Sequence, residues 1–473
     1  MAELGNVGGT RDFLPDEMIR REYVIDTLKR IFRKYGFEPL ETPALERWET
    51  LAGKYGEEGE KLIYHVVSSG ALDSLKPGER TDLALRYDLT VPLARVVAMY
   101  GDQMQVDPQN PKKQVRKLPR PFKRYQVQAV WRGDRPGAGR FREFTQCDAD
   151  VIGSTSLLAE AELIALVAEV FAALGFADFT VKINHRRLLQ GLIEWAGLPP
   201  SKEAAVLSSI DKLDKLSVAE VRSELHSKGI EASAIDRLFQ VIELTGESTH
   251  LLIQARSILA DSPAALVAID ELESLLGYLE AYQVPADHYK VDLALARGLD
   301  YYTGLIFETV TSAPVGSVGG GGRYDKLIYD LSGGKTDQPA CGTSFGLDRL
   351  LAAMEHLGLL AQVPRPTEVM VLRFTDPGVD TFTQTLVRQL RAAGIRTELG
   401  YYDAPFTPDG MRQQLGYANE KAVPYTVILG PDELAQQVVA LRDMTTRKQE
   451  KLPLGEAAMY IVRKLRPRLG ETE

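Results

Sequence analysis

Apolar residues near the start of the chain recur at the spacing of helices, with extended segments between them. Residues 18–35 place apolar side chains on one helical face, and Gly36 marks the expected end of that helix. Residues 81–100 change from the alternation of a strand, at Leu83 and Leu85, to the period of an amphipathic helix. We therefore expect the first hundred or so residues to mix helices with short strands.

Two longer strands are expected in the next part of the chain. Residues 122–131 and 141–152 are rich in β-branched and aromatic side chains, and the loop between them contains three glycines. This pattern predicts an antiparallel hairpin. A long apolar helix is expected to follow at residues 157–174.

The second half of the chain separates into a helical segment and two segments that mix strands and helices. Residues 199–285 have helical periodicity and few strand signals, which predicts an all-helical insertion. Strands are expected at 291–295 and 304–311, and residues 340–354 should run from a strand into a helix. Beyond a linker with two prolines, strands and helices alternate. We therefore expect a domain of residues 1–365 that contains the insertion at 199–285, and a separate α/β domain of residues 366–473.

Composition is that of an ordinary globular protein. The 473 residues suggest two to four domains, and 44% hydrophobic with 26% charged residues suffices for a large core. No apolar run approaches the roughly 20 residues of a membrane helix, and Met1–Arg11 lacks the apolar stretch of a secretory signal. Cys147 and Cys341 are too few for a disulfide framework or a four-cysteine zinc site. We expect a cytoplasmic protein that makes no contact with a membrane.

Charge is distributed unevenly along the chain. The net charge of −9 argues against indiscriminate binding of polyanions, yet residues 112–142 carry eleven Lys or Arg and one acid, Asp134. Aromatic side chains, including Phe122 and Trp131, interleave with these cations. A phosphate-facing segment and a solvated basic loop both explain the pattern.

Two groups of polar residues could bind a small ligand next to the predicted strands. Asp88 and Thr90 lie two residues apart at a strand end, where they could accept hydrogen bonds from an ammonium group or cap the following helix. Gln146, Asp148 and Asp150 alternate onto one face of a strand, where they need either a ligand or water.

Arginines at the hairpin loop suit an anionic ligand. Arg132, Arg135, Arg140 and Arg142 surround the loop, and a guanidinium binds carboxylate or phosphate through two parallel hydrogen bonds. Phe141 could offer a flat face to a nucleobase. A solvated turn is the alternative.

Three further motifs follow in the second half of the chain. Arg297 and Gly298 precede the paired Tyr301 and Tyr302, which could wall a polar pocket or pack on the core. Residues 316–322 hold five glycines, which favour either close approach of a ligand to backbone or a flexible turn, and which do not fit the Walker phosphate loop. Arg349 is expected in the first turn of a helix, where it could face ATP or pair with Asp348. Together the motifs suit a reaction that joins a carboxylate to the α-phosphate of a nucleotide.

These motifs resemble the histidyl-tRNA synthetases, a family of class II aminoacyl-tRNA synthetases. Residues 36–43, 122–150 and 346–349 are similar to class II motifs 1, 2 and 3, and the stretches 297–302 and 321–325 are similar to segments specific to the histidine enzymes. The sequences of residues 85–90 and 146–150 resemble those of the eukaryotic and archaeal branch of this family. The resemblance implies an α+β fold, in which the class II core is an antiparallel sheet flanked by helices. It also implies the helical insertion and a C-terminal α/β anticodon-binding domain.

The resemblance further implies a role for each motif residue. Asp88, Leu89, Thr90 and Gln146 would line the site of the histidine ammonium, and Asp150 and Tyr302 would hold the imidazole beside Tyr301. The catalytic residues would be Arg132 and Arg297, at the carboxylate and the α-phosphate. The ATP-binding residues would be Arg132, Arg140, Phe141 and Arg349. The implied partners are ATP with Mg²⁺, L-histidine, tRNA(His) and a second copy in a homodimer, and no motif for a protein-bound metal is present.

Two other classes of protein are rival hypotheses for this chain. A regulatory subunit of ATP phosphoribosyltransferase usually lacks the terminal domain and loses pocket residues. A non-catalytic RNA-binding or signalling module would show degraded motifs. The motif positions here are filled and a terminal domain is expected, so the ligase is the favoured hypothesis.

Overall fold

The computed structural model describes residues 4–70, 81–137, 139–296 and 301–465. The chain forms two compact units, residues 1–361 and 362–473. Each unit has its own hydrophobic core. None of the described helices combines the length and apolar character that would let it cross a membrane.

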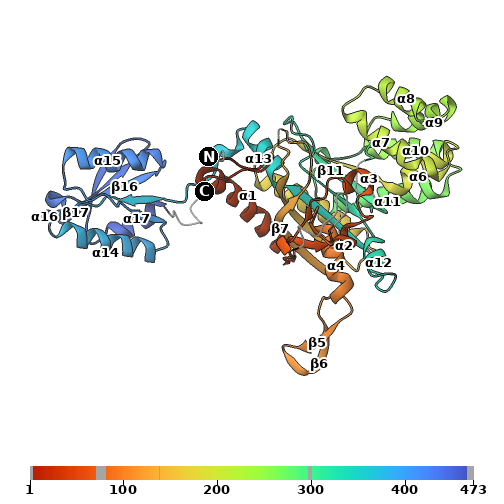
Figure 1. Cartoon of the computed structure of the whole chain (residues 1–473). Helices are drawn as coiled ribbons and strands as arrows, with labels where there is room; N and C mark the ends of the chain where they lie inside the picture. The colour runs from red at the N-terminus through yellow and green to blue at the C-terminus, as the bar shows by residue number, and fades with distance from the viewer. Residues whose placement is uncertain (1–3, 71–80, 138, 297–300, 466–473) are drawn as a thin grey trace. The chain divides into compact units, whose positions relative to one another are not determined.

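An eight-stranded sheet forms the centre of the first unit (Figure 1). Most neighbouring strands are antiparallel, and only the two edge pairs, β1 with β7 and β9 with β10, are parallel. The expected hairpin is the β7–β8 pair. In sheet order the strands are β1 (Glu38–Pro39), β7 (Phe122–Trp131), β8 (Glu143–Ile152), β13 (Ala340–Gly346), β12 (Gly319–Arg323), β11 (Leu305–Thr311), β9 (Phe179–His185) and β10 (Tyr289–Val291).

Helices with buried apolar stripes pack on this sheet. In α1 the residues Val24, Leu28 and Ile31 are fully buried because they recur at three- and four-residue spacing. The helix α5 is apolar nearly all round, and it contacts both α1 and β13. The helices of this layer are α1 (Pro15–Lys34), α5 (Leu158–Ala173) and α13 (Leu347–His356).

A smaller layer supports the region where the first polar motif lies. The strands β2 (Leu45–Arg47), β4 (Leu83–Leu85) and β3 (His65–Val66) form a three-stranded sheet. The helix α4 (Thr90–Tyr100) follows β4 and packs against α12 (Leu327–Leu331). Two short helices, α2 (Trp48–Leu51) and α3 (Gly56–Glu60), complete this layer.

The segment expected to be an all-helical insertion, residues 199–285, is described throughout; it consists of helices joined by turns and contains no strand. Its long helix α11 contacts α6 and α5 of the sheet-containing part. The helix α6 (Arg186–Trp195) precedes the segment, and η4 (Ala286–His288) follows it. The helices within it are η2 (Pro200–Lys202), α7 (Glu203–Ile210), η3 (Asp211–Asp214), α8 (Val218–Ser227), α9 (Ala232–Ile242), α10 (Ser248–Ile258) and α11 (Pro263–Ala281).

The position predicted for the strand at 291–295 is wrong, because the observed strand is β10 (Tyr289–Val291). β10 ends at Val291, and Asp292 then turns the chain, since its carbonyl accepts a hydrogen bond from the Leu295 N–H at 3.0 Å. Val291, Leu293 and Leu295 are each buried although residues 292–295 form no ladder. The alternation of buried side chains at residues 291–295 therefore gave the pattern of a strand although the backbone turns.

A two-stranded hairpin that the sequence analysis did not predict extends from the first unit. Its strands β5 (Met104–Asp107) and β6 (Asn110–Arg116) pair only with each other (Figure 1). The short helix η5 (Leu359–Gln362) lies at the boundary between the two units along the chain.

The second unit is an α/β domain with a five-stranded sheet. The strands are β15 (Thr397–Leu399), β14 (Val369–Val371), β16 (Tyr425–Ile428), β17 (Val438–Asp443) and β18 (Gln449–Pro453), in that order across the sheet. Its helices are α14 (Val379–Ala392), α15 (Pro408–Glu420), α16 (Pro431–Ala435) and α17 (Ala457–Leu465). The predicted α+β architecture is confirmed.

Candidate active site

Asp88 lies between β4 and α4, buried with 1% of its surface exposed. Its Oδ1 accepts hydrogen bonds from the Tyr55 hydroxyl at 2.9 Å and from the Val91 N–H at 3.1 Å. Its Oδ2 accepts one from the Tyr301 hydroxyl at 3.4 Å. The capping interpretation of the motif is therefore confirmed, because the carboxylate binds the first turn of α4, and the binding of an ammonium group stays a prediction. Burial raises the pKa of Asp88, while the Val91 N–H and Arg132 act in the opposite direction.

The β8 face carries a buried ion cluster. Its β8 residues were expected from the sequence, and its arginine was not. Gln146, Asp148 and Asp150 share this face, and Arg124 stands opposite Asp150 on β7. An Arg124 guanidinium nitrogen lies 2.9 Å from Asp150 and 3.9 Å from Asp148. Burial raises the pKa of Asp148 to about 7, although Arg124 opposes this effect. Two carboxylates therefore share one arginine in a site closed to bulk water.

Three acceptor oxygens of this face have no hydrogen-bond partner among the described residues. They are Gln146 Oε1, Asp148 Oδ1 and Asp150 Oδ2; the last has Arg124 in ion-pair range without hydrogen-bond alignment. Buried acceptors without partners are rare in folded proteins. Their grouping indicates a ligand that supplies N–H donors.

Tyrosines form the opposite wall of this cluster. The Tyr301 ring lies 5.1 Å from that of Tyr302 and 5.8 Å from that of Tyr324. The Tyr324 hydroxyl donates to Asp150 Oδ1. Burial raises the pKa of Tyr302, as do the nearby carboxylates of Asp150 and Asp148. The phenol thus stays protonated at neutral pH and remains a donor.

The glycine-rich segment is a strand, β12, and its role differs from both interpretations made from the sequence. A Cβ added to Gly322 would lie 2.9 Å from Tyr302 Cδ1, and one added to Gly321 would lie 2.5 Å from Phe307 Cζ. On the neighbouring strand, a Cβ at Gly342 would lie 1.9 Å from Asp150 Oδ1. These glycines leave the space that the pocket walls occupy.

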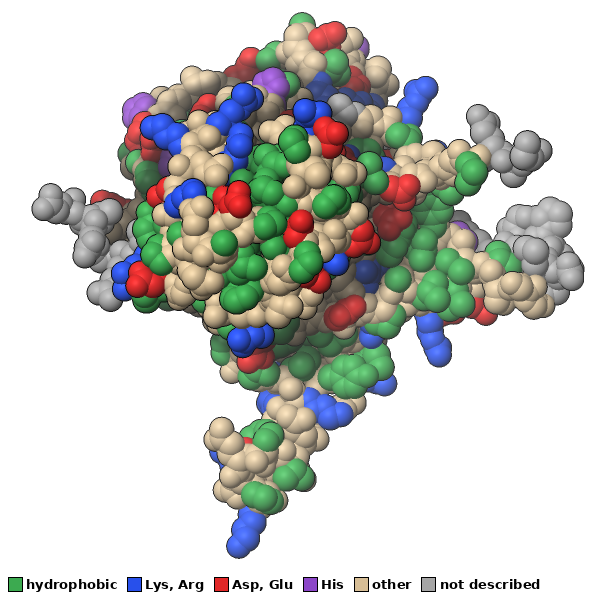
Figure 2. All heavy atoms as spheres, turned by 90° about the vertical axis from the view of Figure 1, so that its left-hand side faces the viewer, with side chains coloured by type: hydrophobic (Ala, Val, Ile, Leu, Met, Phe, Trp, Pro, Cys, Tyr) green, Lys and Arg blue, Asp and Glu red, His purple; other side chains and the backbone are tan. Residues whose placement is uncertain are grey.

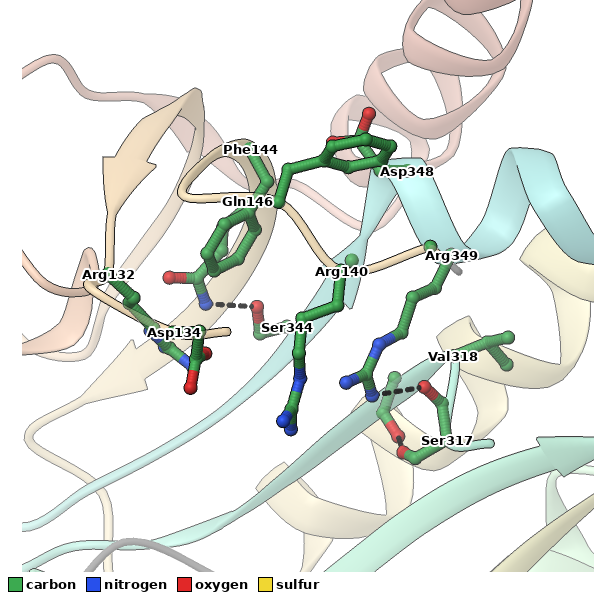
Figure 3. Close-up of a pocket in the computed structure, with 14 residues that line it drawn as sticks. Arg132, Asp134, Arg140, Phe144, Gln146, Ser317, Val318, Ser344, Asp348 and Arg349 are labelled. Atoms are coloured by element: carbon green, nitrogen blue, oxygen red, sulfur yellow. Dashed lines mark hydrogen bonds between the residues drawn. The ribbon is translucent and has the colours of Figure 1, made fainter. Parts of the chain in front are cut away.

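An arginine-lined pocket adjoins this cluster (Figure 3). Arg132, Arg140 and Arg349 line it, and Gln146 is common to both sites. Arg132 is fixed by a hydrogen bond from Nε to the Tyr87 carbonyl at 3.0 Å, and its guanidinium lies 4.2 Å from the Tyr87 ring centre. Arg349 donates to the Ser317 carbonyl at 3.0 Å. The hairpin loop contributes Arg132 and Arg140 and the start of α13 contributes Arg349, so two segments bring three cations to one cavity.

Asp348 pairs with α1 and the N-terminal segment instead of with Arg349. Its Oδ1 accepts from Arg21 at 2.6 Å and from Arg11 at 3.0 Å, and Oδ2 accepts from the Thr145 N–H at 3.2 Å. Phe141 lines the same pocket as the arginines, and its ring lies under the Arg11 guanidinium at 4.2 Å. Arg11 therefore occupies one side of the aromatic surface expected for a nucleobase.

The structure brings together most of the residues that the sequence analysis selected. Asp88, Leu89 and Thr90 lie at the start of α4, beside the tyrosines and the β8 face. Arg297 lies outside the described residues. Tyr55, Arg124, Tyr324 and Ser344 were not identified as site residues from the sequence. Arg124 had one signal, since it is a charged residue inside a strand of mostly apolar and aromatic neighbours.

No group of three or more His, Cys, Asp or Glu side chains within the described ranges is placed to hold a metal ion. Cys147 and Cys341 are both buried, and burial raises the pKa of each thiol.

An antiparallel sheet with a motif 2 hairpin, a strand-to-helix motif 3 and a cavity of arginines between them is the core of a class II aminoacyl-tRNA synthetase. A model of the histidyl-tRNA synthetase family matches residues 9–350, and a model of an anticodon-binding domain matches residues 368–464. The chain belongs to the histidyl-tRNA synthetase family.

Full-length relatives and solved structures are in agreement with this family. A histidine–tRNA ligase of Gloeobacter violaceus is 72% identical over 98% of this chain and 100% of its own length. One of Cytophaga hutchinsonii is 42% identical over 96% of this chain and 98% of its own. The crystal structure of a histidyl-tRNA synthetase from Nostoc sp. PCC 7120 is similar with a TM-score of 0.83 and 30% identity, over 98% of this chain and 100% of that one.

The assignment to the eukaryotic and archaeal branch, which the sequences of two motifs suggested, is wrong. These full-length relatives are bacterial. Similarity to the eukaryotic and archaeal branch in two short segments therefore does not extend to the chain as a whole.

Proposed function

We propose that this protein is a histidine–tRNA ligase, which activates L-histidine with ATP and transfers the histidyl group to the 3′ end of tRNA(His). One observation supports the proposal: a buried site rich in acceptors and phenols adjoins, at Gln146, a cavity lined by three arginines. The first part suits an amino acid with an ammonium group and an imidazole. The second part suits the phosphates of ATP.

The imidazole of histidine would bind between Asp150 and Tyr302. A neutral imidazole has one N–H donor and one acceptor nitrogen. Asp150 Oδ2 has acceptor capacity to spare, and the protonated Tyr302 phenol is a donor. A side chain without both polar atoms would leave one of these buried groups unpaired, which costs the affinity that makes the site selective.

The histidine ammonium would bind at the start of α4. Asp88 supplies the charge, with Thr90, the Leu89 backbone and Gln146 around it. Gln146 Oε1 lacks a partner among the described side chains, so an ammonium N–H would satisfy it. Tyr301 would shape this end of the pocket by its contact with Asp88.

ATP would bind against the arginine cavity. Arg132 would contact the histidine carboxylate and the α-phosphate, while Arg140, Phe141 and Arg349 would hold the outer phosphates and adenine. Arg132 is held rigidly by its bond to the Tyr87 carbonyl, and a fixed fork loses little entropy when it binds. Arg297 is proposed as the second catalytic cation on the family resemblance alone.

The reaction requires no protein nucleophile. The histidine carboxylate attacks the α-phosphorus, the bond to the β-phosphate oxygen breaks, and pyrophosphate leaves. The protein contributes alignment and positive charge around the α-phosphate. Mg²⁺ would bind the outer phosphates, and the pocket residue Asp134 could add one carboxylate oxygen to its shell.

The proposal also covers the domain boundaries, the binding partners and the cellular location of the protein. Residues 1–365 would carry catalysis, residues 199–285 would form an insertion within them, and residues 366–473 would read anticodon bases of tRNA(His). The motif 1 segment would form a homodimer, and the protein would act in the cytoplasm. Light scattering of the purified protein tests the dimer.

Histidine-dependent exchange of pyrophosphate into ATP tests the activity. Among the twenty amino acids, only histidine should support rapid exchange. Arg297→Ala should abolish exchange and leave the unfolding temperature unchanged. A folded wild-type protein that binds tRNA but catalyses no exchange would contradict the proposal, and full exchange by Arg297→Ala would remove that residue from the mechanism.

A further inference from the structure

The hairpin of β5 and β6, with its flanks, forms an arm of residues 102–120 that has no part in the core. Its strands pair with no strand but each other, and nearly all of its side chains are exposed. In Figure 2 it projects at the bottom of the molecule as a thin extension. An isolated two-stranded hairpin is marginally stable in water, so it adds little to the stability of the fold. Its exposed surface is available to a partner.

The base of the arm is fixed to the catalytic unit. Asp102 lies 3.2 Å from Arg116 and 2.5 Å from Arg120, and it accepts a hydrogen bond from the Thr336 hydroxyl at 3.2 Å. Lys117 donates to Gln103 Oε1 at 2.7 Å. These contacts hold the direction of the arm, and they leave the strands beyond them open to solvent.

The arm is basic although the protein is acidic. It contains five Lys or Arg and two Asp, in a chain whose net charge is −9. Lys112 and Lys113 are exposed on β6, and no carboxylate lies within ion-pair distance of either among the residues that the structure describes. A pair of unneutralised lysines on an acidic molecule is a local site for polyanions.

The remaining side chains favour phosphate contacts over base recognition or a protein partner. Residues 102–120 include four glutamines and one asparagine but no aromatic ring on which a base could stack. The exposed Met104 and Val106 stand opposite Arg116 and Gln114 across the ladder. Polar neighbours therefore interrupt the apolar surface, which is unlike the core of a protein interface.

The position of the arm separates it from the reaction centre. It leads directly into β7, whose ten residues span about 33 Å before the chain reaches Arg132. A nucleic acid on the arm thus cannot be the reacting 3′ end. We propose that the β5–β6 arm binds the phosphate backbone of tRNA, away from the acceptor end, through Lys112 and Lys113. This inference rests on the proposed function for the identity of the RNA.

The double variant Lys112→Gln/Lys113→Gln tests the inference in the full-length protein. Its tRNA(His) dissociation constant should rise by about three- to thirty-fold at low salt. The slope of log affinity against log salt should become shallower by about 0.7–0.9 for each lost phosphate contact. Exchange of pyrophosphate at saturating histidine and ATP should stay unchanged, because the arm is remote from the pocket.

A matched control removes the same charge elsewhere. Lys215→Gln/Lys290→Gln changes two exposed lysines of the same unit and should leave both affinity and salt slope unchanged. Equal losses in the two double variants would overturn the inference, as would wild-type affinity and slope in the arm variant. A loss of dimer by the arm variant in sedimentation, with tRNA binding retained, would assign the arm to a second copy. Absence of exchange in the wild type would instead refute the proposed function.

Discussion

Gly342→Ala provides a sharp test of the histidine site because one added methyl group strikes a binding residue. The new Cβ would lie 1.9 Å from Asp150 Oδ1, and ordinary contact begins near 3.4 Å, so the carboxylate must retreat by about 1.5 Å. That movement breaks the hydrogen bond from Tyr324 and the 2.9 Å ion pair with Arg124. A charged hydrogen bond contributes about 1.5–3 kcal/mol.

The expected kinetic effect falls on one substrate. If Asp150 can no longer accept from the imidazole N–H, that loss corresponds to a rise in the KM for histidine of about 10- to 150-fold. The KM for ATP should stay within about two-fold of the wild type, because the arginine cavity does not contain Gly342. Pyrophosphate exchange with each substrate varied in turn measures both constants.

Folding must be checked in the same variant. Overpacking in a core costs about 1–3 kcal/mol, so the unfolding temperature should fall while the protein stays folded. Gly277→Ala is the control, since an added Cβ on this α11 residue meets nothing within 4 Å and should raise helix stability by up to about 1 kcal/mol. A histidine KM within about two-fold of the wild type in folded Gly342→Ala would refute the assignment of Asp150. If Gly342→Ala does not fold, Asp150→Asn must show the same selective rise in the histidine KM.

Three further predictions concern other groups of the two sites. Tyr302→Phe removes the donor to the imidazole and should raise the histidine KM by about ten-fold or more with little effect on the ATP KM, and equal effects on both constants would contradict this role. Arg349→Ala should raise the ATP KM by at least about ten-fold in the same exchange assay, and an unchanged value would remove Arg349 from the ATP site. Burial raises the pKa of Asp148 from 3.8 to about 7, so the folded protein holds a proton that the unfolded chain releases within this range. The free energy of unfolding should therefore fall as the pH rises from about 4 to 7, and Asp148→Asn should flatten that part of the profile in urea titrations; parallel profiles would disprove it.

Periodic burial made much of the fold predictable from the sequence. The helices α1 and α13 carry apolar stripes and α5 is apolar nearly all round, as buried helices require, and β7 and β8 flank a loop rich in glycine. The same reasoning failed at residues 292–295, where buried side chains alternate in a turn. Hydrophobic periodicity predicts which side chains are buried, and it does not predict which backbone groups form hydrogen bonds with another strand.

The site was predictable to the extent that its chemistry is visible in single segments. Asp88, Gln146, Asp150 and Tyr302 were selected because polar groups stand at strand ends or on apolar strands, or because the motifs resemble a family. Arg124 was missed because its role depends on β7 lying beside β8, so that one guanidinium reaches two carboxylates on the next strand. The basic stretch 112–142 was treated as one segment, whereas the fold divides it between the arm, the sheet strand β7 and the pocket loop.

The sequence by itself determined the local propensities, the division of polar and apolar faces, and the membership of the family. Only the tertiary structure decided why Gly321 and Gly322 stand in β12: the rings of Phe307 and Tyr302 occupy the space where their side chains would lie. It also decided that Asp348 neutralises Arg21 and Arg11, which leaves the Arg349 side chain directed into the cavity with Arg132 and Arg140. The reason is physical, since steric exclusion and the pairing of buried charges depend on distances between segments that lie far apart along the chain.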